Sequence, residues 1–181
     1  MIGRLCLTPE KLALHVVTDF APDQSLEIAH CADLGALLVE LDRLRSSDNL
    51  FYAIRVDGDF ELMHTRAMCR AEEGVALAAA AAHQPEFKLP GVSGTMVGFW
   101  SPSYIQALEI PGYHLHFIDV RRAAGGHVLG LSGGPLRIQT ARLKDFQLAL
   151  PTSVEYLRAD LGRDPSRDLE LAEKARQEET K

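Results

Sequence analysis

The feature that most constrains the fold is the segment GYHLHFIDVRRAAGGHV, residues 112–128, which holds three of the seven histidines. Residues 113–118 are rich in aromatic and apolar side chains and contain no breaker, which predicts a β-strand. Residues 121–126 are typical of a turn, and a return strand is expected from His127. This segment therefore predicts a hairpin of two antiparallel strands.

The predicted hairpin gathers imidazoles on one face. Side chains at positions i and i+2 of a strand share a face, so His114 and His116 are expected side by side. The return strand can bring His127 opposite this pair. Three neutral imidazoles on one face are typical of a catalytic zinc site with an open coordination position. The spacing alone leaves an ordinary surface cluster of histidines open as the alternative.

Composition limits the class of protein. The 181 residues suffice for one domain with a core or for two small lobes. The net charge of −6 and the absence of a basic run disfavour nucleic acid as a partner. No stretch approaches the roughly 18 apolar residues of a membrane span, and the first residues carry no signal-like apolar segment. Cys6, Cys31 and Cys69 form no disulfide framework, so we expect free thiols in the cytoplasm.

The rest of the chain predicts a β-rich α/β protein. Leucines at helical spacing predict an amphipathic helix over residues 33–45. We expect strands over residues 12–20, 50–56, 59–66, 92–100, 135–140 and 143–150. Asp57-Gly58 and Gly133-Gly134 are predicted turns. An alanine-rich run over 75–82 predicts a short helix, and residues 158–181 predict a charged, exposed tail.

At the histidine hairpin the chain resembles the α-acetolactate decarboxylase family. The motifs GYHLHFI and GGHVL carry the resemblance, with NLFYAIRVDGDF at 49–60, TRAMCR at 65–70, QPEFKLPGVSGTMVGFWSPSY at 84–104 and LALPTSVEYLRADL at 148–161. These segments follow the order of the family. The resemblance runs from about residue 12 to about residue 173, and its motifs are long and specific.

The resemblance implies a zinc-dependent carboxy-lyase that converts 2-acetolactate to acetoin and carbon dioxide. It implies three zinc ligands, His114, His116 and His127. It also implies a site arginine, which corresponds to Arg66, with Ala67 where the family has threonine. A C-terminal glutamate of the family corresponds to Glu173, or to Glu170 if the tail is shifted. His64 lies two residues before Arg66 and is therefore expected on the same strand face.

Zinc is expected to supply the electron sink for decarboxylation. Arg66 is suited to hold the departing carboxylate or the enediolate through paired planar donors. Glu173 is expected to orient a zinc-bound water or to relay the proton that the product carbon requires.

The chain also departs from the family pattern. Family members carry an N-terminal segment whose Asp-Gly-Glu turn places a glutamate beside the zinc, and the Asp-Gly-Asp of residues 57–59 belongs to a later position. We therefore expect a partial N-terminal α/β lobe with a mixed sheet over 1–90. A small, antiparallel, barrel-like zinc-binding lobe with a charged tail is expected over 91–181. Because strand edges would be exposed, a homodimer is also expected.

Slow decarboxylation by the 181-residue chain is the corresponding functional expectation. Two alternatives stay open on the sequence. One is a catalytically impaired zinc-binding homologue that acts as a binding or structural protein. The other is a metal enzyme that catalyses a different reaction on the same scaffold.

Overall fold

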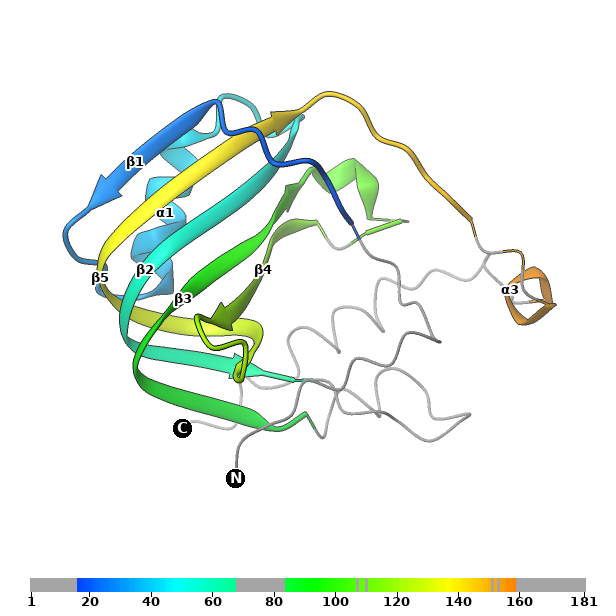
Figure 1. Ribbon diagram of the computed structural model, residues 1–181. Helices are drawn as coiled ribbons and strands as arrows, with labels where there is room; N and C mark the ends of the chain where they lie inside the picture. The colour runs from blue at the N-terminus through cyan, green and yellow to red at the C-terminus, as the bar shows by residue number, and fades with distance from the viewer. Residues whose placement is uncertain are drawn as a thin grey trace, which may run out of the picture.

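The fold is built on one antiparallel sheet. A computed structural model of the protein describes residues 16–67, 84–106, 108–109, 111–150, 152 and 154–158. The strands are β1 (Gln24–Ile28), β2 (Phe51–Arg66), β3 (Glu86–Ser101), β4 (Gly112–Asp119) and β5 (Gly125–Leu143). They lie in the order β1-β5-β2-β3-β4 (Figure 1). The helical elements are α1 (Leu34–Leu44), the 3-10 turn η1 (Ser103–Ile105) and α3 (Val154–Arg158).

The sheet confirms a β-rich chain, but the mixed sheet expected over residues 1–90 is wrong where the structure describes it. Every pairing between the described strands is antiparallel. In addition, β4 pairs with β5, so the pairings β2–β3, β3–β4, β4–β5 and β5–β2 form a ring. Residue 90, the expected lobe boundary, lies inside β3. The division of the chain into two lobes stays a prediction.

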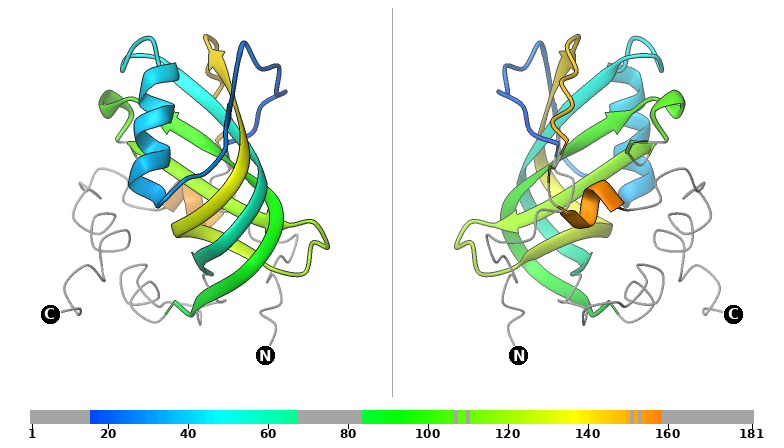
Figure 2. Two further views of the ribbon diagram at one scale, coloured as in Figure 1. Left: turned by 90° about the vertical axis from the view of Figure 1, so that its left-hand side faces the viewer. Right: turned by 90° about the vertical axis from the view of Figure 1, so that its right-hand side faces the viewer.

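Helix α1 confirms the helix expected over residues 33–45. The Asp33 carboxylate accepts a hydrogen bond from the Ala36 backbone N–H at 2.8 Å, which caps the first turn. Leu37 and Leu41 lie one helical turn apart and are almost completely buried. Figure 2 shows α1 on one side of the sheet and α3 on the other. The helix therefore covers one face of the strands with its apolar stripe.

The hydrophobic core lies between α1 and the sheet and continues along the inner face of the strands. Its fully buried side chains include Leu37, Val56, Phe60, Met63, Met96, Leu136 and Ile138. Phe60 and Phe117 pack edge to face with ring centroids 5.4 Å apart. This core fixes which face of each strand turns inward.

Both predicted glycine turns are wrong, because they lie inside long strands. β2 runs without a break through Asp57-Gly58, and β5 runs through Gly133-Gly134. A Cβ atom on Gly58 would lie 2.4 Å from the Pro135 carbonyl oxygen, and one on Gly133 would lie 2.6 Å from the Asp59 carbonyl oxygen. The register between β2 and β5 also shifts at this point. The glycines thus serve a close backbone approach between the strands rather than a chain reversal.

The strand expected over residues 12–20 is also wrong where the structure describes it. Residues 16–20 form no strand, and Val17 is 86% exposed. The first strand among the described residues is instead β1, which pairs with β5. Residues 144–150 likewise form no strand. The predicted helix at 75–82 and the residues of the tail from 159 onward lie outside the described residues.

Candidate metal centre

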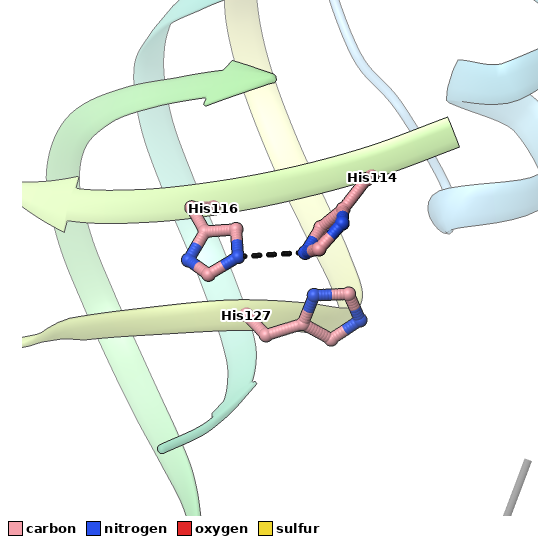
Figure 3. A group of neighbouring side chains, drawn as sticks. All are labelled: His114, His116 and His127. Atoms are coloured by element: carbon pink, nitrogen blue, oxygen red, sulfur yellow. Dashed lines mark hydrogen bonds between the residues drawn. The ribbon is translucent and has the colours of Figure 1, made fainter. Parts of the chain in front are cut away.

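The histidine hairpin forms as predicted. His114 and His116 lie on β4, and His116 stands directly opposite His127 of β5. Leu115 and Phe117 are buried on the other face of β4, so strand alternation turns the two histidines away from the core. Figure 3 shows the three imidazole rings turned toward one another across the two strands.

The distances between the rings suit a single metal ion. The Nε2 atoms of His114 and His116 are 2.9 Å apart, and ligand nitrogens of all three histidines lie within 4.8 Å of one another. Tetrahedral zinc with ordinary zinc–nitrogen bonds holds its ligand nitrogens about 3.3 Å apart. The ligand nitrogens of the three imidazoles therefore lie near the spacing that one shared ion requires.

The protonation of the site also suits a metal. Burial lowers the pKa of His114, and the positive charge of Arg66 lowers it further. Burial and the charges of His114, Arg66 and His116 lower the pKa of His127 to about 3. Near neutral pH both rings are therefore uncharged, which is the form in which imidazole binds a metal.

Two glycines allow His127 to reach this position. A Cβ atom on Gly125 would lie 2.3 Å from the Phe117 carbonyl oxygen of β4. Gly126 has φ +151°, and a Cβ atom there would lie 2.4 Å from the Arg66 carbonyl oxygen of β2. β5 thus passes closely between β4 and β2 just before His127, which requires residues without side chains.

The structure brings Arg66 to the histidines. Arg66 is the last residue of β2 and stands directly opposite His127. Its charge acts on both His114 and His127. The sequence-predicted arginine and the three predicted ligands therefore share one face. Glu173 and its alternative Glu170 lie outside the described residues, so their role stays a prediction.

Sequence reasoning missed one residue on this face. The Nε2 atom of His64 lies 2.9 Å from Oε2 of Glu86, and Glu86 stands directly opposite Arg66. Strand alternation predicts His64 on the face of Arg66, but it does not point to Glu86. Glu86 was missed because β3 begins six residues before the expected start at residue 92. The Gln84-Pro85 pair marks the start of β3 and was the available signal.

No described helix is long and apolar enough to cross a membrane.

Fold and site together define an antiparallel β-protein with a three-histidine candidate metal centre and an adjacent arginine. The model of the α-acetolactate decarboxylase family matches residues 4–163, and the chain belongs to this family.

Individual relatives agree with this assignment. The chain is 40% identical to the α-acetolactate decarboxylase of Methanosarcina mazei over 87% of this chain and 55% of the relative. It is 37% identical to that of Bacillus licheniformis over 85% of this chain and 62% of the relative. The crystal structure of α-acetolactate decarboxylase from Bacillus subtilis superimposes with a TM-score of 0.81 at 34% identity, covering 86% of this chain and 68% of that one. The chain thus spans less than two thirds of the first two relatives.

Proposed function

We propose that the protein is a carboxy-lyase that converts 2-acetolactate to acetoin and carbon dioxide. The observation that carries the proposal is the convergence of His114, His116 and His127 beside Arg66 in a member of this family. In the proposal the three imidazoles hold one zinc ion. Three protein ligands would leave a coordination position for a small substrate.

A bound zinc ion would supply a Lewis acid for the electron pair that remains when carbon dioxide leaves. The chain's own residues prepare the site for this chemistry. The neutral imidazoles offer their nitrogen lone pairs without losing protons first, because burial keeps the pKa of His114 and of His127 low. Arg66 presents a planar set of donors that suits the substrate carboxylate.

The product carbon then needs a proton on one face. We assign this proton transfer to Glu173, or to Glu170 if the tail is shifted, as the resemblance implies. Slow turnover by this chain stays a prediction that rests on the resemblance. The loss of one positioned acid or base typically costs about 10²–10⁴-fold in rate.

The second candidate function is a zinc-binding homologue without catalysis, which the same ligand set would support. We also propose a homodimer and a cytoplasmic location. The three widely spaced cysteines of the sequence, which suggest no disulfide framework, support a reducing compartment.

The test is an assay of acetoin formation from racemic 2-acetolactate by the purified chain, together with its zinc content. We expect one acetoin enantiomer and a rate that falls about 10²–10³-fold in Arg66→Met, while zinc content is retained. Zinc without acetoin in the wild-type chain would favour the non-catalytic homologue. Acetoin formation that is unchanged in Arg66→Met would refute the role of the arginine.

A further inference from the structure

We propose that Glu86 and His64 are positioning residues that orient Arg66 toward the candidate metal centre. The inference deepens the proposed function and rests on it for the role of Arg66. It assigns no proton transfer to either residue.

The first observation is a hydrogen-bonded pair at the end of β2. His64 Nε2 and Glu86 Oε2 lie 2.9 Å apart. The His64 side chain is 24% exposed to solvent and the Glu86 side chain is 32% exposed. His64 is half-buried, and Glu86 lies at the surface of the sheet. A hydrogen bond between two side chains restricts the arrangements that both can adopt.

The second observation is the place of this pair in the sheet. Arg66 stands between Glu86 of β3 and His127 of β5, directly opposite each. Residues that face each other across antiparallel strands have Cβ atoms about 4.5–5.5 Å apart on the same side of the sheet. His127 in turn stands opposite His116 of β4. One row of side chains therefore crosses four strands from the carboxylate to the metal ligands.

The chemistry of the row explains the proposed role. Arginine is long and flexible, and a carboxylate beside it favours one arrangement of its guanidinium group. Glu86 bonds to His64 through one oxygen, and its register position directly opposite Arg66 places its carboxylate on the side of the sheet that carries the Arg66 side chain. His64 lies on the same face as Arg66, two residues earlier on β2, so it fixes the Glu86 side chain from that direction.

A purely structural role would give a different outcome. β2 and β3 pair along most of their length, and the pairing extends past Arg66 to the hydrogen bond from Ala67 N–H to the Pro85 carbonyl. If the pair only fastened these strand ends, its loss would lower stability. The effect of that loss on probe binding would then be the same with and without Arg66.

The experiment measures binding of 2-hydroxy-2-methylbutanoate to the zinc-loaded chain by calorimetry. This probe keeps the tertiary hydroxyl and carboxylate of the substrate but lacks the ketone that permits decarboxylation. We expect Glu86→Gln to weaken binding about tenfold, because it removes the negative charge that stands opposite Arg66, with unchanged zinc affinity. In the Arg66→Met background the same substitution is expected to add nothing, because Glu86 acts through Arg66.

His64 provides a second variant. We expect His64→Leu to weaken probe binding and His64→Gln, which keeps a donor, to restore much of it. The matched control is Glu61→Gln on the same strand, where an exposed His30–Glu61 pair is 3.8 Å apart. This control is expected to leave probe binding unchanged.

Unchanged probe binding in Glu86→Gln, or equal weakening with and without Arg66, would overturn the inference. Failure of the wild-type chain to bind the probe would also overturn it, since a carboxylate site at Arg66 is required. Probe binding with the expected coupling, but no acetoin formation, would refute only the proposed function.

Discussion

The position of the histidines at the candidate metal centre depends on the close approach of strand backbones as well as on side-chain chemistry. Gly126 illustrates this, because its φ is +151° and a Cβ atom there would lie 2.4 Å from the Arg66 carbonyl oxygen. The backbone of β2 therefore leaves no room for a side chain at this position. We expect Gly126→Ala to cost about 1–3 kcal/mol of unfolding free energy and to weaken zinc binding.

The matched control for this substitution is Gly130→Ala on the same strand. A Cβ atom there would meet its nearest neighbour, the Cβ of His64, at an ordinary 3.8 Å. Urea unfolding and zinc titration of both variants provide the measurement. Equal effects of the two substitutions would show that close strand approach is not what places His127.

Asp57 gives a pH dependence at the residue scale. Hydrogen bonds from Arg55 and from Thr95 lower the pKa of the Asp57 carboxyl below its usual value. A lowered folded-state pKa adds stability above the unfolded-state pKa, near 4, and this stability is lost as pH falls through the folded-state value. We expect Asp57→Asn to be less stable than wild type at pH 7 and to lose less stability on acidification.

Unfolding free energies measured from pH 7 down to pH 3 check this expectation. Thr95→Val removes one donor to the carboxylate, so the pH dependence of its unfolding free energy is expected to lie between those of wild type and Asp57→Asn. If the unfolding free energies of wild type and Asp57→Asn fell in parallel with pH, Asp57 would not be the source of this pH dependence.

At the scale of elements, Arg45 joins the end of α1 to the sheet. Its side chain is only 10% exposed, bonds to Asp42 and Asp48, and stacks 3.5 Å from the centre of the Trp100 ring of β3. It also donates to the hydroxyl of Tyr113 on β4, next to His114. Burial and these hydrogen bonds make Arg45 the main polar link between helix and strands.

We expect Arg45→Met to destabilise the protein by about 2 kcal/mol, through loss of charge-assisted hydrogen bonds and of ring stacking. Arg43→Met is the matched control, because Arg43 pairs with Glu40 on the exposed side of the same helix with 69% of its side chain exposed. That pair is expected to contribute less than about 0.5 kcal/mol. Thermal unfolding of both variants is the measurement. Similar shifts in the melting temperature would contradict the role of Arg45 in joining α1 to the sheet.

The same elements show how far the sequence predicts the structure. Alternation along residues 113–118 predicts the histidine face, and leucine spacing predicts α1, because both patterns are local. The Asp57-Gly58 pair misleads, since the same residues suit a turn and a close crossing of two long strands. The position of Glu86 opposite Arg66 depends on the register between β2 and β3, which no local pattern specifies.

At the scale of the whole molecule, β1 is the open edge of the described sheet. It pairs with β5 on one side, and no described strand pairs with its other side. Unpaired strand edges favour association between chains. We expect a dimer at micromolar concentration in sedimentation equilibrium, and Ser25→Lys on this exposed strand is expected to raise the monomer fraction. A wild-type chain that sediments as a monomer throughout that range would contradict the proposal.

The most direct test of the account is reconstitution of the metal-depleted chain with zinc while acetoin formation from 2-acetolactate is followed. We predict that activity returns in proportion to bound zinc and saturates at about one ion per chain. His116→Ala, which removes one of the three converging imidazoles, is predicted to lose both high-affinity zinc and activity. Zinc binding and acetoin formation at wild-type levels in His116→Ala would contradict the account.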